Sequence, residues 1–230
     1  MLIYIGLDDT DTLESRGTGR LAREIASNLA QSLTLLGIIR HQLFHDPRVP
    51  YTSHNSCAVI LVEAPSHTDL AALERQVRTL MLADFQPGSD PGLCLADQID
   101  TEVINFGLRA QGNVVTQEEA RGLAQRKGIL LNGLGGTEDG VIGALAGVGL
   151  AASGNDGRYI LIGNARELSG LQTVDTILKT GITAVRTLQD EPVTEGLILA
   201  EKLRPARRNG KPVIYVEWKE EYWQPLKLDY

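Results

Sequence analysis

The sequence predicts a protein of the α/β (α+β) class with a mixed sheet, and three observations lead to this. Short apolar runs typical of buried strands, such as residues 2–7 and 57–64, alternate with stretches of helical periodicity. The chain has 230 residues, of which 43% are hydrophobic and 22% charged, so it can bury one large core or two small ones. No fixed-period repeat and no low-complexity tract interrupts it.

The first elements follow from periodicity and from breakers. Residues 2–7 are apolar and end at an aspartate, which predicts a buried strand. Leucine and isoleucine recur every four residues over 18–33, which predicts an amphipathic helix. A second strand is expected over 35–44, and two prolines mark the next dozen residues as a long loop before the strand at 57–64.

Capping patterns place the later helices. Ser66 or Thr68 is expected to cap a helix that runs to about residue 81. Thr116 followed by Glu119 forms a capping box for a helix that ends near residues 127–128, while residues 100–109 are ambiguous. The remaining predicted elements are a helix at 141–152, a strand at 159–163, a helix at 174–179 and a strand at 211–218.

Composition narrows the class of function. The formal net charge is −7, from 22 Lys+Arg against 29 Asp+Glu, which argues against broad nonspecific nucleic-acid binding. The two cysteines, Cys57 and Cys94, cannot form a four-cysteine zinc site and are expected to fill apolar space, with a disulfide as the alternative. No signal peptide and no membrane span of about 20 apolar residues is recognisable, so we expect a cytoplasmic protein with no membrane partner.

Three carboxylates follow the first predicted strand: Asp8, Asp9 and Asp11. Like charges this close repel each other unless a cation or a basic partner neutralises them. Mg²⁺ prefers oxygen ligands from one or two carboxylates and shares them with substrate phosphates. The cluster therefore predicts a metal or phosphate site, and the alternative is a solvated turn with helix-capping acids.

The same residues fit a second reading. "DTDT" at residues 9–12 matches the pattern of haloacid-dehalogenase phosphatases, in which Asp9 would be the nucleophile and Asp11 the acid/base. That chemistry also needs a lysine and a late acidic pair, for which Lys127 and residues 138–139 are candidates. The glycine usual after the second aspartate of this pattern is absent.

A glycine-rich turn, "NGLGGTEDG", precedes the helix predicted at 141–152. Backbone N–H groups of such a turn and the start of a helix can bind phosphate, and small residues along the helix allow it to pack closely on another backbone. The turn is neither a Walker A motif nor a Rossmann fingerprint, so a tight structural loop is the alternative. Glu138 and Asp139 would either cap the helix or add carboxylates to the first cluster.

Two further segments are candidates for substrate contact. The proline-bounded loop carries Tyr51, His54 and Asn55, a mixture suited to substrate binding, although an irregular connector is the simpler reading. The basic run at 204–211 could meet phosphates or form a solvated turn.

Taken in order, four segments resemble one family. "IGLDDTDT…RGTGRLA", "PRVPYTSHNSCAV", "VVTQEEA" and "GLGGTEDGVIGALAGVGL" are similar to the archaeal tRNA-isoleucine agmatidine synthetases, also called 2-agmatinylcytidine synthetases. The resemblance implies a kinase-like domain at 1–60, a ferredoxin-like domain at 61–165 and a C-terminal segment at 166–230 that packs back on the core. It covers the catalytic core of the family without its OB-like and zinc-ribbon domains.

The resemblance also implies site residues. Asp8, Asp9 and Asp11 match the acidic positions that hold ATP and Mg²⁺, and Thr18 falls near the threonine that becomes phosphorylated. Gly17, directly before it, is expected to help bind the phosphates of ATP. Of the glycine-rich turn, Gly135, Gly136 and Gly140 match the family's segment near the phosphates.

The proline-bounded loop departs from the family pattern, because Tyr51, Thr52 and His54 replace a tryptophan and two basic residues. Nucleic-acid affinity depends heavily on phosphate contacts, so tRNA binding is in doubt. We therefore predict an ATP- and Mg²⁺-dependent, ligase- or kinase-like enzyme that activates an oxygen for displacement by an amine. Its substrate would be a small molecule, a nucleotide or a partner-presented tRNA. The alternatives are a noncatalytic nucleotide-binding module and the Asp9 phosphatase, and the oligomeric state is not predicted.

Overall fold

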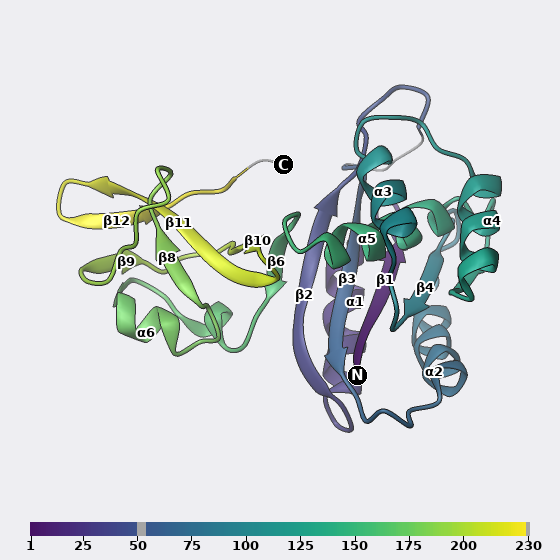
Figure 1. Ribbon diagram of the computed structural model, residues 1–230, viewed down its shortest axis with the longest axis horizontal. Coiled ribbons are helices and arrows are strands. Elements are labelled where there is room, and N and C mark those ends of the chain that lie inside the picture. The colour runs from purple at the N-terminus through teal and green to yellow at the C-terminus, as the bar shows by residue number, and fades with distance from the viewer. Residues whose placement is uncertain (50–53, 229–230) are drawn as a thin grey trace.

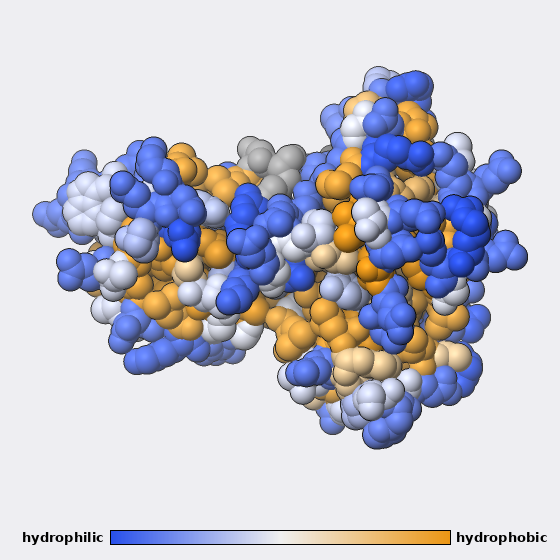
Figure 2. Space-filling model, in the orientation of Figure 1, coloured by the Kyte–Doolittle hydropathy of each residue, from blue (hydrophilic) through white to orange (hydrophobic). Residues whose placement is uncertain are grey.

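The computed structural model describes residues 1–49 and 54–228, which form two lobes joined through strand β6, Arg158–Leu161 (Figure 1). The molecule narrows between the lobes, and polar side chains cover much of their outer ends (Figure 2). The strands of the described residues form one continuous sheet path, β5-β4-β1-β3-β2-β6-β10-β11-β12-β9-β7, with β8 beside β11. Both helices and strands are abundant, so the predicted mixed α/β class is confirmed.

The N-terminal lobe is an antiparallel sheet between two layers of helices. Helices α1 and α2 cover one face, and α3, α4 and α5 cover the other (Figure 1). The strands are β1 (Leu2–Asp8), β2 (Thr34–Gln42), β3 (Ser56–Glu63), β4 (Gly92–Ala96) and β5 (Leu130–Gly133). The helices are α1 (Thr18–Leu29), α2 (Leu70–Ala83), α3 (Thr101–Arg109), α4 (Gln117–Lys127) and α5 (Gly140–Ser153).

Alternation along the strands fills both faces of this sheet. In β1, Ile3, Ile5 and Leu7 are fully buried under α1 and α2, because every second residue of a strand points to the same side. On the opposite face, a Cβ atom at Gly6 would collide with the Ala144 carbonyl of α5. The glycine therefore lets α5 lie directly on β1, which is the close backbone packing predicted for this small-residue helix.

The C-terminal lobe is built on short strands around a separate core. Ile177, Ile198 and Ile214 are almost fully buried in it. Its elements are a 3₁₀ turn (Ala165–Glu167), β7 (Leu171–Thr173), α6 (Val174–Leu178), β8 (Ala184–Arg186), β9 (Leu197–Leu199), β10 (Ala206–Arg208), β11 (Lys211–Lys219) and β12 (Tyr222–Pro225).

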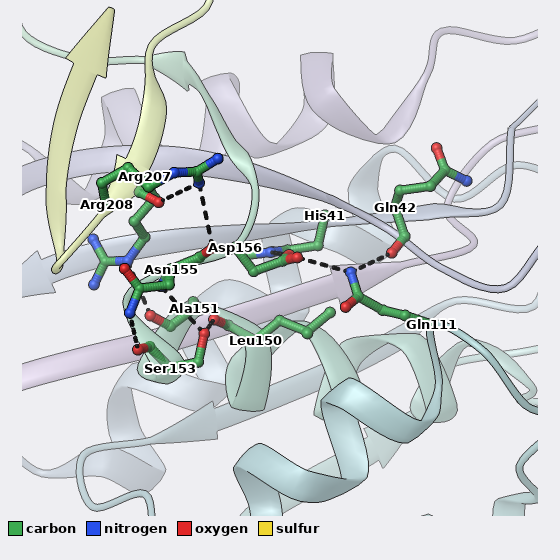
Figure 3. Close-up of polar contacts among 10 residues, drawn as sticks. All are labelled: His41, Gln42, Gln111, Leu150, Ala151, Ser153, Asn155, Asp156, Arg207 and Arg208. Atoms are coloured by element: carbon green, nitrogen blue, oxygen red, sulfur yellow. Dashed lines mark hydrogen bonds and ion pairs between the residues drawn. The ribbon is translucent and has the colours of Figure 1, made fainter. Parts of the chain in front are cut away.

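A polar network ties the two lobes together on the α5 face (Figure 3). The buried Asp156 lies 2.6 Å from Nδ1 of His41 on β2 and accepts a hydrogen bond from Gln111, at 2.9 Å. On β10, the buried Arg207 donates to the Ala151 carbonyl near the end of α5, at 3.0 Å. Burial lowers the pKa of His41, so the ring is held neutral between lobes.

Several expectations about the elements are corrected. Asp69, and not Ser66 or Thr68, caps α2, because its carboxylate accepts from the Ala71 and Ala72 amides. The helix predicted over 18–33 ends at Leu29, although Leu33 still packs against the core. The capping box of Thr116 and Glu119 is confirmed, with both of its hydrogen bonds present.

The predicted boundary at residue 60 falls inside β3, and β4 and β5 extend the same sheet as β1. The division into kinase-like and ferredoxin-like domains, and the boundary at residue 165, stay predictions. Both cysteines are free and buried, so they fill apolar space as predicted. In the part of the chain that the structure describes, no helix is long and apolar enough to cross a membrane.

Candidate active site

The acidic cluster lies at the end of β1, at the point where the chain leaves the sheet. Asp8 is the last residue of the strand, and Asp9 adopts a left-handed backbone conformation with φ of 49°. Residues other than glycine rarely adopt this conformation, and such strain gathers at functional sites. The turn at Asp9 leads the chain toward α1, whose first residue is Thr18.

A cavity of about 440 Å³ opens over this turn. Both polar and apolar side chains line it. The polar lining includes Asp8, Asp9, Asp11, Thr18, His54, Asn55, Gln117 and Asp139, and the apolar lining includes Leu43, Phe44, Val114, Val115 and Ile142. A cavity of this size with a few convergent polar groups is typical of a small-molecule site.

Two carboxylates of this cavity, those of Asp8 and Asp9, have raised pKa values. Burial raises the pKa of Asp8 to about 8, and the neighbouring charge of Asp9 adds to the effect. Burial also raises the pKa of Asp9 to about 6, with further contributions from Asp90, Asp11 and Asp139. A cation in the cavity would relieve this repulsion, and perturbed acids gathered in a cleft mark a candidate functional site.

Thr18 is held at the edge of the cavity by hydrogen bonds. Its hydroxyl donates to Oδ1 of Asp11 at 2.9 Å and accepts from the Thr10 hydroxyl at 3.0 Å. Thr10 and Thr18 are both buried. A hydroxyl within hydrogen-bond reach of a carboxylate meets one geometric requirement of an activated nucleophile.

Glycines of α5 make room for the acidic cluster. A Cβ atom at Gly143 would collide with the Asp8 carboxylate, and one at Gly140 would lie 2.9 Å from the Asp8 carbonyl. The Gly140 amide, which a phosphate could have used, donates instead to the Asp90 carbonyl at 2.9 Å.

The other glycines of the turn lie elsewhere. Gly135 packs against the Phe85 ring, and Gly136, with φ of 61°, lies against Asp90. Neither lines the cavity, whereas Gly140 does. Gly17 borders a second cavity that shares Thr18 with the first. The assignment of these four glycines to phosphate binding stays a prediction.

The two acids after the glycine-rich turn separate in space. Asp139 lines the cavity, and its side chain accepts a hydrogen bond from Gln117 at 2.7 Å rather than capping α5. Glu138 points away and pairs with Arg121 at 2.5 Å. Lys127, the lysine considered for the phosphatase reading, pairs with Asp100 at 2.6 Å and does not line the cavity.

The proline-bounded loop also contributes to the lining of the cavity. His54 and Asn55 line the cavity, and the Asn55 amide donates to the Phe44 carbonyl at 2.6 Å, which fixes the shape of the wall. Tyr51 lies outside the described residues. Substrate contact by these residues stays a prediction.

The acidic side chains of the cavity are candidate ligands for a metal ion. Among residues 1–49 and 54–228, no group of three or more His, Cys, Asp or Glu side chains is gathered as a metal site. The donor set nevertheless fits Mg²⁺, because this ion takes one or two carboxylates and completes its shell with water and substrate phosphates.

Sequence reasoning missed two parts of the site. Asp90 acts on Asp9 from the loop before β4, eighty residues away in the chain. The apolar wall comes from the end of β2, the segment before α4 and the first turn of α5. No local pattern joins these segments, although the valine pair before the Thr116 cap is an unusual feature of a polar connection.

Comparisons with known proteins agree with the resemblance read from the motifs. No family model matches the chain. A tRNA-isoleucine 2-agmatinylcytidine synthetase from Pyrococcus horikoshii is 32% identical over 158 residues, which cover 65% of this chain and 36% of the relative.

Two solved structures match with a TM-score of 0.58 over 65% of this chain and 36% of theirs. One is a tRNA fluorescent labelling enzyme, at 26% identity, and the other is the agmatidine synthetase in complex with an isoleucine tRNA and ATP, at 25% identity. The chain spans about a third of the length of these relatives. In sequence and in fold, 65% of this chain is therefore similar to part of the tRNA-isoleucine agmatidine synthetases, and the predicted resemblance to that family is confirmed.

Proposed function

We propose that this chain is an ATP- and Mg²⁺-dependent enzyme that activates an oxygen by phosphorylation so that an amine can displace it. One observation carries the proposal: the Thr18 hydroxyl donates to Asp11 at the edge of a cavity that also holds Asp8 and Asp9. The similarity to a synthetase solved in complex with ATP supports it.

The cavity suggests how ATP would lie. The adenine would pack against the apolar wall of Phe44, Val114 and Ile142, and the phosphates would extend toward Thr18 and the aspartates. Asp9 and Asp11, with Asp8 behind them, would hold Mg²⁺. When bound, the ion neutralises the phosphates and the charge that develops during phosphoryl transfer.

The residues of the chain would then act in sequence. Asp11 orients the Thr18 hydroxyl and accepts its proton as the γ-phosphoryl group bonds to the Thr18 oxygen and ADP leaves. The phosphoryl group passes next to the substrate oxygen, the bond from phosphorus to the Thr18 oxygen breaks, and Asp11 returns its proton to Thr18. An amine finally displaces that oxygen, which leaves as inorganic phosphate. Asp8, held protonated up to a pH of about 8 when the cavity is empty, would ionise only as the cation enters.

The substrate would be a small molecule, a nucleotide or a tRNA presented by a partner. The Pyrococcus relative is named for an isoleucine tRNA, yet this chain spans 36% of it and carries a net charge of −7. We propose ATP and a small amine as the ligands of this cavity, in a cytoplasmic protein.

Calorimetric titration with a nonhydrolysable ATP analogue, with and without Mg²⁺, tests the proposal. We expect Mg²⁺-dependent binding that Asp9→Asn abolishes and that Asp175→Asn, an exposed aspartate on α6, leaves unchanged. Absence of binding to the wild-type chain would contradict the ATP site. Binding without turnover of amines, nucleotides or tRNA would favour the noncatalytic module, and a phosphoaspartate at Asp9 formed without ATP would favour the phosphatase.

A further inference from the structure

A second cavity, of about 340 Å³, lies on the other side of Thr18 at the junction of the lobes. It shares Asp11, Thr18, His54 and Ser56 with the first cavity. Its remaining charged lining consists of six arginines: Arg20, Arg23, Arg40, Arg158, Arg166 and Arg204. The two cavities therefore differ in charge, and Thr18 and Asp11 are among the residues that line both.

The arginines come from both lobes. Alternation along β2 directs Arg40 to the α1 face, where Arg20 and Arg23 approach from the helix. Arg158 lies on β6 and is the antiparallel register partner of Arg40. Like charges directly opposite each other in a ladder destabilise a sheet, so this pair is unfavourable unless something neutralises it.

Acidic side chains of the protein neutralise little of the positive charge of these arginines. Arg20 pairs with Glu24 at 3.0 Å, whereas the other five arginines have no ion pair among the residues that the structure describes. Arg40 donates to the Ser56 hydroxyl at 2.9 Å, and Arg166 to the Ile160 carbonyl at 3.1 Å. Burial, followed by the neighbouring arginines, lowers the pKa of Arg23 and Arg204.

The N-terminus of a helix also favours an anion in this cavity. Helix α1 has twelve residues and begins at this cavity with Gly17, Thr18 and Gly19. Its N-cap, Gly17, supplies no side-chain hydrogen bond, so the first amides of the helix lack that cap. An uncapped helix N-terminus favours an anion, and here it coincides with unpaired arginines.

We propose that this cavity binds the phosphate groups of a small phosphorylated substrate, next to Thr18 and across it from ATP. Calling the ligand a substrate rests on the proposed function, whereas the anion site itself does not. One guanidinium group can donate two hydrogen bonds to the oxygens of a phosphate, and several guanidinium groups converge here from different elements. A cavity of about 340 Å³ in a chain of net charge −7 favours a small ligand over a nucleic-acid backbone.

Titration with inorganic pyrophosphate in EDTA tests this site, because without Mg²⁺ the acidic cavity repels the anion. We expect saturable, salt-sensitive binding that weakens at least tenfold in Arg158→Gln and in Arg204→Gln. Arg126→Gln is the matched control, because Arg126 is exposed on α4 and lines neither cavity. Thermal unfolding without ligand checks the fold, and Arg158→Gln should be at least as stable as the wild type because it removes the opposed pair.

The outcomes separate the two proposals. Asp9→Asn should keep pyrophosphate binding while it loses ATP analogue binding. Arg158→Gln should lose pyrophosphate binding while it keeps ATP analogue binding. Unchanged pyrophosphate binding in both arginine variants, or no binding to the wild type, would overturn the anion site whatever happens to ATP. Loss of pyrophosphate in Asp9→Asn would place the anion in the first cavity. A single-stranded oligonucleotide that binds these arginines more tightly than pyrophosphate would replace the small ligand with a nucleic acid.

Discussion

Replacing Asp8 with asparagine should stabilise the protein in a strongly pH-dependent manner. In the folded state the pKa of Asp8 is raised from 3.8 to about 8, first by burial and then by Asp9. The folded chain therefore keeps a proton on Asp8 that the unfolded chain releases above a pH of about 4. Asp8 therefore costs the folded state no stability below that pH, and the free energy of unfolding decreases as the pH rises toward about 8.

The magnitude follows from the two pKa values. A shift from 3.8 to about 8, at about 1.4 kcal/mol per unit, sets an upper limit near 6 kcal/mol. Asp8 is half-buried and faces the cavity, so water and small movements will reduce this value. We expect Asp8→Asn to raise the free energy of unfolding by roughly 2–4 kcal/mol at a pH of about 8.5, with little change at a pH of about 4.

Urea unfolding at a series of pH values, in EDTA, measures the effect. Asp175→Asn is the matched control, because its side chain is 85% exposed and should change stability by less than about 0.5 kcal/mol at every pH. A stability gain that is the same at both ends of the pH range would refute the reasoning, since it would come from packing and not from ionisation. The stabilised variant should also lose Mg²⁺-dependent ATP binding.

Three further predictions concern packing, the lobe junction and Thr18. Gly143→Ala should lower the free energy of unfolding by about 1–3 kcal/mol, because its Cβ collides with Asp8, whereas Gly122→Ala on α4 should not; thermal unfolding of both variants checks this. Arg207→Met should lower it by roughly 2–4 kcal/mol in urea, because buried acceptors such as the Ala151 carbonyl lose their donor; a loss below about 0.5 kcal/mol would show that the hydrogen bonds of Arg207 are dispensable for stability. Thr18→Val should abolish phosphate incorporation from labelled ATP while Thr18→Ser retains it; incorporation by the valine variant would remove Thr18 from the reaction.

Local sequence determined the elements whose signals are contained within a few residues. The run at 2–7 became β1, and the pair Thr116 and Glu119 capped α4, because burial of an apolar run and a capping box depend on near neighbours in the chain. The glycines along 140–149 likewise indicated a helix packed closely on another backbone, and Gly6 of β1 supplies that contact. Where signals were weak, as at 92–96 and 130–133, the strands went unpredicted, because sheet neighbours decide whether so short a run is extended.

The candidate site was only partly visible in the sequence. Clustered aspartates at 8–11 indicated a cation or phosphate site, because their repulsion is evident from spacing alone. Which partners meet them was decided by topology: β1 lies between β3 and β4, so Asp90 and Asp139 approach from distant loops. The glycines at 135 and 136, which looked alike in the sequence, pack against Phe85 and Asp90 instead of the cavity.

The charge of the second cavity shows most clearly what the sequence determined and what the tertiary structure decided. As a sequence, the chain is acidic, and the arginines that line this cavity are scattered from residue 20 to residue 204. Pairing of β2 with β6 sets Arg40 against Arg158, and α1 adds two more beside the Thr18 hydroxyl. Sequence alone therefore determined the clustered negative charge at the tip of the first strand, because those residues are neighbours in the chain. Tertiary structure alone decided that a basic cavity stands behind it, because the potential at a site depends on charges brought together from distant parts of the chain.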